Sequence, residues 1–176
     1  MSVLPPFRAK TESVEMPQQQ LDSYNVLVID DALMIRNLVH TVLLELGFKN
    51  VDMANGGKQA LDLIRRKKYD FVITDWSMED VDGISIVKTL RATQQAPLSI
   101  IMLTANTEVA HVKTAIKAGV DAYLIKPFSA EHLAKRIIEI IENPRAFIIS
   151  PKYRGPDRRR ANKPPPDGVE KRRKKK

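Results

Sequence analysis

The rest of the chain is interpreted from one stretch, Asp70-Phe71-Val72-Ile73-Thr74-Asp75-Trp76-Ser77-Met78-Glu79-Asp80-Val81-Asp82-Gly83. Its apolar, β-branched part, Phe71 to Ile73, is short and typical of a buried strand. The strand would end at the carboxylate of Asp75, and the acidic residues and glycine that follow are typical of a turn. Ligands of open α/β sheets bind at the carboxyl ends of the strands, so Asp75 is a candidate site residue.

Four more apolar runs surround this stretch, and segments with helical spacing separate them. The predicted strands are residues 25–29, 51–54, 71–75, 98–103 and 120–125, and a helix is predicted after each of them. Strands that alternate with helices predict an α/β fold, in which a doubly wound, five-stranded parallel sheet carries five helices on its two faces.

Four of the five predicted strands end in a group with useful chemistry: Asp30 with Asp31, Asp75, Thr104 and Lys126. Parallel strands bring these ends to one edge of the sheet. Three carboxylates repel one another unless a cation joins them, and ligation by oxygen alone suits Mg²⁺. A lysine and a hydroxyl add donors for a phosphoryl group, and an aspartate can itself be the nucleophile. The pattern therefore predicts phosphoryl transfer onto Asp75, with Lys126 holding the transferred oxygens.

These motifs resemble the receiver domain of two-component response regulators, and most closely its CheY-like, chemotaxis-type branch. The matching motifs are Val28-Ile29-Asp30-Asp31, Asp75-Trp76-Ser77-Met78, Asp82-Gly83, Thr104-Ala105 and Lys126-Pro127-Phe128. They occur in the family's order and at similar spacing. The resemblance covers about residues 24–143, and it implies a flavodoxin-like sheet with strand order 2-1-3-4-5.

The resemblance also implies a role for each matching residue of the phosphorylation site. Asp75 matches the phosphoacceptor, and Asp30 and Asp31 match the acidic pair that serves Mg²⁺. The backbone carbonyl of Ser77 matches the group that completes the metal site. Lys126 matches the lysine that binds the phosphate.

Two further residues match the family's conformational switch. Thr104 matches the switch hydroxyl and Tyr123 the switch aromatic, although an aromatic residue in a strand is more often part of the core. The family usually has a cis peptide bond at the position of Lys126-Pro127. The chain departs from the family at Glu79, where proline is usual, and this makes the loop after Asp75 unusually acidic.

We therefore expect a single-domain response regulator in two-component phosphorelay signalling. It would receive a phosphoryl group from a histidine kinase or a phosphotransfer protein and would change its binding to a downstream protein partner. Its Mg²⁺-dependent phosphorylation and dephosphorylation would be self-catalysed, but the product is a signal, so it would not be classed as an enzyme. A phosphatase of small substrates is disfavoured, because such enzymes usually carry a second acid at the position of Ser77.

The chain divides into three parts: a disordered leader (residues 1–23), the receiver domain (24–143) and a flexible basic tail (144–176). Prolines, a run of glutamines and little apolar periodicity mark the leader, whereas proline and positive charge mark the tail. Residues 151–176 hold 12 Lys/Arg against 3 Asp/Glu, a net charge of +9, so the first 150 residues carry −1 of the total +8. The tail suggests an alternative function, in which the receiver gates binding to a polyanion, either nucleic acid or anionic lipid. Tyr153, Gly155 and Pro156 add shape to the charge, which slightly favours docking to a protein.

Other functions are disfavoured by what the sequence lacks. It contains no DNA-reading motif, so sequence-specific DNA binding is not expected. No apolar run is long enough for a transmembrane segment, and the absence of cysteine fits a cytoplasmic setting. His40, His111 and His132 are widely separated and are interpreted as surface or boundary residues, not as metal ligands.

Overall fold

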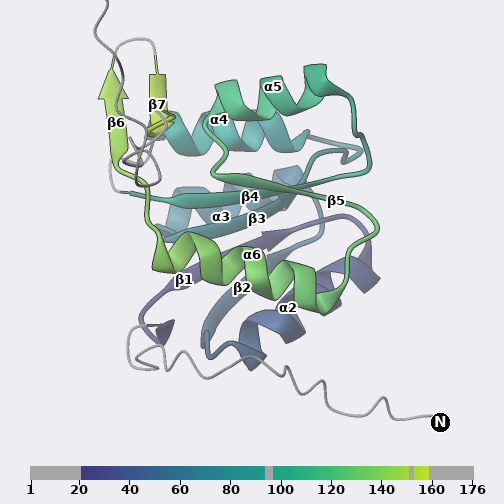
Figure 1. The fold of residues 1–176 in the computed structure, drawn as a ribbon. Coiled ribbons are helices and arrows are strands. Elements are labelled where there is room, and N and C mark those ends of the chain that lie inside the picture. The colour runs from purple at the N-terminus through teal and green to yellow at the C-terminus, as the bar shows by residue number, and fades with distance from the viewer. Residues whose placement is uncertain (1–20, 94–96, 151–152, 159–176) are drawn as a thin grey trace, which may run out of the picture.

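The computed structural model describes residues 21–93, 97–150 and 153–158. Five parallel strands form a central sheet in the order β2-β1-β3-β4-β5 (Figure 1). The strands are β1 (Asn25–Ile29), β2 (Asn50–Ala54), β3 (Phe71–Asp75), β4 (Ser99–Thr104) and β5 (Ala122–Ile125). The predicted fold class and strand order are confirmed.

Five helices connect and follow these strands. They are α2 (Leu33–Glu45), α3 (Gly57–Arg66), α4 (Gly83–Thr93), α5 (Val109–Ala118) and α6 (Ala130–Glu142). At two helix ends, a single residue explains why the helix begins or ends there. The hydroxyl of Ser129 accepts a hydrogen bond from the backbone N–H of His132 and so caps the start of α6. Gly119 ends α5 in the left-handed conformation that glycine favours, with φ of +99°.

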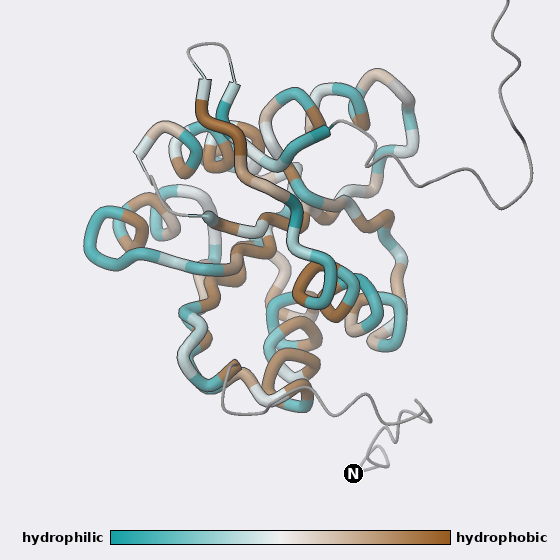
Figure 2. Tube along the Cα trace, turned by 60° about the vertical axis from the view of Figure 1, so that its left-hand side comes forward, coloured by the Kyte–Doolittle hydropathy of each residue, from teal (hydrophilic) through white to brown (hydrophobic). Residues whose placement is uncertain are grey.

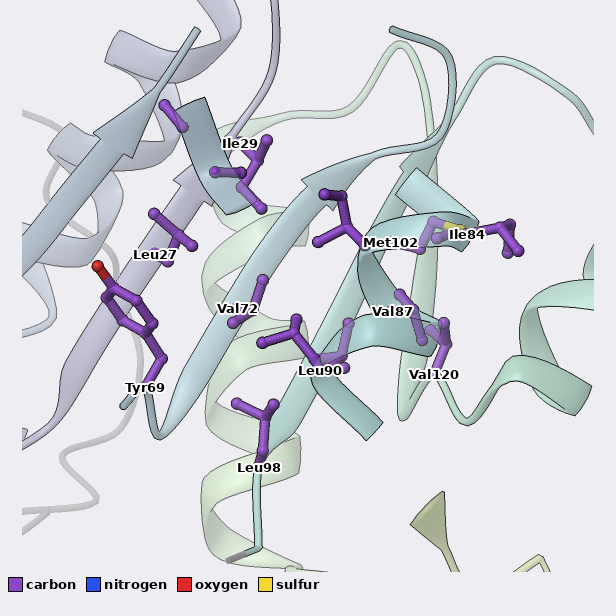
Figure 3. Packing of buried hydrophobic residues seen from close by; sticks show 14 of the residues in the cluster. Leu27, Ile29, Tyr69, Val72, Ile84, Val87, Leu90, Leu98, Met102 and Val120 are labelled. Atoms are coloured by element: carbon purple, nitrogen blue, oxygen red, sulfur yellow. The ribbon is translucent and has the colours of Figure 1, made fainter. Parts of the chain in front are cut away.

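The helices form two layers, one on each face of the sheet. Alternate residues of each strand point to opposite faces, so that Leu27 and Ile29 pack toward α3, α4 and α5, while Val26 and Val28 pack toward α2 and α6. Figure 3 shows the first of these clusters, and Figure 2 shows apolar segments gathered in the interior. All of β3 is buried, as the apolar run predicted. Within the described residues, no helix combines the length and the apolar character needed to cross a membrane.

The structure corrects the prediction that a flexible tail begins at residue 144. Strands β6 (Phe147–Ser150) and β7 (Tyr153–Pro156) pair as an antiparallel hairpin, in which Phe147 lies opposite Pro156. Gly155 and Pro156 are buried, and the Tyr153 hydroxyl donates a hydrogen bond to the carbonyl of Pro156. These residues therefore serve the folding of the hairpin, so their presence no longer argues for docking to a protein.

A buried arginine explains why this basic, proline-containing segment folds. The guanidinium of Arg91, on α4, lies 5.2 Å from the ring centre of Phe147, which is a cation–π contact. Arg154 donates a hydrogen bond to the carbonyl of Ala92, at 3.2 Å, and Arg158 stacks on Tyr153 at 3.9 Å. Each of these arginines therefore contacts an aromatic ring or a backbone carbonyl, whereas composition alone associates such positive charge with disorder.

The boundary of the predicted leader also moves. Leu21 is buried and packs with the cluster beneath α2 and α6. Asp22 forms an ion pair with Lys49, and its carbonyl accepts a hydrogen bond from Asn50 at 2.8 Å. The folded unit therefore includes residues 21–23, while residues 1–20 of the predicted leader and 159–176 of the predicted tail lie outside the described residues.

Candidate phosphorylation site

The acidic cluster is built by two neighbouring strands that end at the same level. In the register of β1 and β3, Ile29 lies beside Thr74, so Asp30 and Asp75 each follow as the next residue. Asp30 and Asp75 are buried and Asp31 is exposed, and each offers a carboxylate oxygen within 4.8 Å of the others. The sheet has brought together the three acids that the sequence singled out.

Lys126 supplies the cation of this cluster. Its Nζ lies 2.7 Å from Oδ2 of Asp30 and 3.0 Å from Oδ1 of Asp75. Lys126 directly follows β5 and is joined to Pro127 by a cis peptide bond, as the family resemblance implied. One ammonium group thus bridges residues that are 96 and 51 positions away in the sequence.

The charges of the cluster perturb one another. Burial raises the pKa of Asp75 above its ordinary value, and the charge of Asp30 acts in the same direction, while Lys126 and the backbone N–H of Trp76 oppose it. Burial alone would lower the pKa of Lys126, but hydrogen bonds and charge from the two buried aspartates outweigh it and raise that pKa. The lysine is therefore held protonated at neutral pH, which suits a group that binds phosphoryl oxygens.

The donor set fits a hard divalent cation. Three carboxylates converge from Asp30, Asp31 and Asp75, and the exposed Asp31 keeps one side open to water. Mg²⁺ prefers oxygen ligands and keeps several waters when it binds. Ser77, whose carbonyl was predicted to complete such a site, lies exposed two residues after Asp75.

The loop after Asp75 is tied down by Asp80. The carboxylate of Asp80 accepts hydrogen bonds from the backbone N–H groups of Gly57 and Lys58, both at 2.9 Å, and of Val81, at 2.7 Å. These hydrogen bonds lower the pKa of the Asp80 carboxyl below its ordinary value, and the bond from Lys58 has the largest effect. At the end of the loop, a Cβ on Gly83 would lie 2.0 Å from the Asp75 carbonyl, so only glycine lets the chain approach this closely.

The two predicted switch residues, Thr104 and Tyr123, both line a small recess. Thr104, at the end of β4, is buried, and its hydroxyl accepts a hydrogen bond from the backbone N–H of Asn106 at 3.0 Å. Tyr123 is half-buried in β5, beside Met102 of β4. The recess has a volume of about 10 Å³, which is about enough for one water molecule and far too small for an aromatic ring.

Sequence reasoning did not assign His111 and Trp76 to this recess. Both side chains line it, and their rings lie 5.1 Å apart. His111 is half-buried, as predicted for a boundary residue, and its Nε2 lies 3.4 Å from the side-chain amide of Asn106. A histidine on an otherwise apolar helix turn gives no signal of this neighbourhood, because the contact with Trp76 spans 35 residues.

A comparison with family models decides the family. The model described as the response regulator receiver domain matches residues 26–138, which is well over half of the chain. The chain belongs to the response regulator receiver family. Receiver domains undergo phosphorylation on aspartate in two-component signalling, and they bind Mg²⁺ at an acidic pocket.

Individual receiver proteins support the same assignment. The chain is 36% identical to the chemotaxis protein CheY-3 of Vibrio cholerae over 118 residues, which are 66% of this chain and 91% of the relative. It is 34% identical to the chemotaxis protein CheY of Pseudomonas aeruginosa, over 66% of this chain and 95% of that protein.

Solved receiver structures share the fold. The chemotaxis response regulator CheY4 of Vibrio cholerae superposes with a TM-score of 0.62 and 30% identity, over 66% of this chain and 98% of that one. The receiver domain of the Francisella response regulator 1452 gives 0.61 and 36% identity, over 68% and 98%. The β6–β7 hairpin lies beyond the residues that match the receiver family model.

Proposed function

We propose that this receiver accepts a phosphoryl group on Asp75 from a histidine kinase or a phosphotransfer protein and thereby switches its binding to a protein partner. The observation that carries the proposal is the position of Lys126, whose ammonium contacts both Asp30 and Asp75. A cation that already bridges the acceptor carboxylate and its acidic neighbour is placed to bind the oxygens of an incoming phosphoryl group.

The reaction is a displacement at phosphorus. An oxygen of the Asp75 carboxylate forms a bond to phosphorus, while the bond from phosphorus to the donor's imidazole nitrogen breaks and the nitrogen keeps the electron pair. Lys126 balances the negative charge of the transferred oxygens. Dephosphorylation reverses the outcome, with water as the nucleophile and the Asp75 carboxylate as the leaving group.

Mg²⁺ would be held by Asp30, Asp31, Asp75 and the backbone carbonyl of Ser77. When bound, it supplies charge neutralisation for the phosphoryl oxygens. The chain's own residues prepare this site: Asp30 and Asp75 are buried and oriented by Lys126, whereas Asp31 faces solvent. Removal of the cation should leave these acids poorly compensated, since one lysine faces three carboxylates.

The surface beside the site suits a protein donor. Leu33 and Met34 begin α2 one residue after the acidic pair, and these two residues are 60% and 83% exposed. Exposed apolar side chains of this size favour burial against a partner. A kinase or phosphotransfer domain that covers them would bring its phosphorylated histidine close to Asp75.

The switch would act through Thr104 and Tyr123. A phosphoryl group on Asp75 offers oxygens that Thr104 reaches by moving inward, and this movement enlarges the recess so that Tyr123 can turn in. Tyr123 also lines a groove of about 640 Å³ over α5, β5 and α6, together with the exposed side chains of Ile116 and Ile125. Rotation of Tyr123 would therefore reshape a surface on which a protein partner can dock.

The test is phosphorylation of the full-length chain by a small acyl phosphate, with and without Mg²⁺. Asp75→Asn should abolish labelling because an amide is a poor nucleophile, and a chelator should prevent labelling of the unmodified protein. Asp62→Asn, which removes an exposed acid from α3, is the matched control and should label normally. Full labelling of the Asp75 variant would overturn the assignment of the acceptor.

The alternative, a polyanion-binding function gated by the receiver, rests on the charge of residues 151–176. A tail of this charge binds nucleic acid or anionic lipid largely by releasing counterions, so its affinity should fall steeply between about 50 and 200 mM salt. Truncation after residue 158 keeps the hairpin and removes most of the charge. If binding to a protein partner still depends on phosphorylation of Asp75 after this truncation, the result favours the phosphorylation switch over polyanion binding.

A further inference from the structure

The hairpin forms one wall of a cavity on the side of the molecule opposite the phosphorylation site. The hairpin lies beside α4 (Figure 1). The cavity, called the groove below, has a volume of about 620 Å³, is open to solvent, and is lined by residues of α4, α5 and the hairpin. Arg91, which lines it, donates hydrogen bonds to the carbonyls of Gly119 and Leu98, the residues that precede β5 and β4. The groove therefore borders the amino ends of the strands, whereas Asp75 ends a strand at the opposite edge.

All the charged side chains that line this groove are cationic. They are Lys88, Arg91, Lys117 and Arg154, and none of the lining residues is acidic. Lys88 and Lys117 are exposed, and no ion pair involves them in the described part of the chain. Unpaired lysines on facing helices attract a ligand that carries several negative charges.

The groove is already in a fixed shape before any ligand binds. Arg91 donates hydrogen bonds to the carbonyls of Gly119 and Leu98 and pairs with Asp121 at 2.9 Å. Arg154 is held by the carbonyl of Ala92. The two arginines thus act as walls, and the two lysines remain available to a ligand at little cost in ordering the backbone.

From this arrangement we infer that the groove binds an acidic segment of a partner protein. Small-molecule sites enclose most of their ligand, whereas this groove is open. Its hydroxyl groups also make internal contacts: Thr114 donates to Ala110, Ser150 to Tyr153, and Tyr153 to Pro156. The groove therefore offers spaced, exposed charges along an open surface, which suits the carboxylates of an extended chain.

Residues 1–20 and 159–176 carry no excess of acids, so we assign the acidic segment to a partner protein. Residues 1–20 contain two acids, Glu12 and Glu15, against two bases, Arg8 and Lys10. Residues 159–176 hold nine Lys/Arg and two Asp/Glu. Neither of these two stretches has the net negative charge that the groove would attract.

A titration of the isotope-labelled full-length protein, followed by nuclear magnetic resonance, tests this inference. The probe is a blocked octapeptide of alternating Glu and Gly, and the uncharged control replaces Glu by Gln. We expect the backbone signals around Lys88, Lys117 and Arg154 to shift together on one binding curve. The double variant Lys88→Gln/Lys117→Gln should weaken binding about tenfold, as the loss of two exposed ion pairs implies.

The matched control is Lys113→Gln/Lys135→Gln, which removes the same charge from exposed positions outside the groove. It should leave the affinity within about twofold of the unmodified protein, and both double variants should still be phosphorylated. Equal weakening by the two double variants, or shifts confined to residues 159–176, would overturn the groove in favour of net charge. Equal shifts with pyrophosphate at the same concentration would overturn the protein ligand in favour of a small anion.

Discussion

The contact between the hairpin and Gly119 can be tested by introducing alanine at two glycines and comparing the resulting losses in the free energy of unfolding. Gly47 and Gly119 follow helices α2 and α5 with almost the same backbone conformation, φ of +100° and +99°. A Cβ on Gly47 would meet nothing within 4 Å, whereas a Cβ on Gly119 would lie 2.8 Å from the carbonyl oxygen of Arg154 and 3.1 Å from Nε of Arg91. Alanine at either position adds backbone strain of about 1–2 kcal/mol. Only Gly119→Ala should also displace the hairpin.

The additional loss follows from the contacts that displacement breaks. The hydrogen bond from Arg154 to Ala92 contributes about 0.5–1.5 kcal/mol, and the cation–π contact between Arg91 and Phe147 about 0.5–2 kcal/mol. Since the two substitutions share the same strain, the free energy of unfolding should be lower for Gly119→Ala than for Gly47→Ala by about 1–3 kcal/mol. Urea unfolding with linear extrapolation gives both values, provided that the slopes agree. Equal losses for the two variants would show that the hairpin does not rest against Gly119, and would refute the reasoning.

Three further predictions concern other parts of the molecule. Arg91→Met leaves its buried acidic partner uncompensated and should lower the free energy of unfolding by about 3–5 kcal/mol in urea; a loss below about 1 kcal/mol would contradict this account. Asp80→Ala should flatten the acid limb of stability against pH, measured by thermal unfolding: the pKa of Asp80 is lowered in the folded state, so its stabilisation is present above the ordinary value of 3.8 and is lost as the pH falls through the folded value. Thr104→Ala should still be phosphorylated but should reduce the phosphorylation-induced change in fluorescence of the single tryptophan, Trp76, which lines the same recess as Tyr123; an undiminished change would separate Thr104 from the switch.

The elements of the fold and the residues of the site could be predicted from the sequence because both depend on local sequence patterns. A buried strand such as Phe71–Asp75 needs only a short apolar run, and a cap such as Ser129 acts within three residues. Parallel strands place all their carboxyl ends on one edge, and four of the five strands end in a reactive residue, so the sequence predicts that Asp30 and Lys126 lie close together. The structure adds the distances that make the cluster specific.

Other features depend on contacts that no local pattern records. Composition predicted a flexible segment after residue 144, yet the hairpin folds because Phe147 reaches a guanidinium 56 residues earlier in the chain. The loop with Glu79 in place of proline is anchored by its neighbour Asp80, through donors more than 20 residues away.

The division has one physical cause. Secondary structure and the direction of a strand follow from the backbone and the spacing of apolar side chains, which a short window of sequence contains. Whether a charged side chain is solvated, capped or buried depends on which distant groups the closed fold brings to it. Arg91 would look like an ordinary surface residue at the end of a helix, but the completed sheet surrounds it with the carbonyls of Leu98 and Gly119 and the carboxylate of Asp121. Burial of that charge, and the hairpin that rests on it, exist only in the tertiary structure.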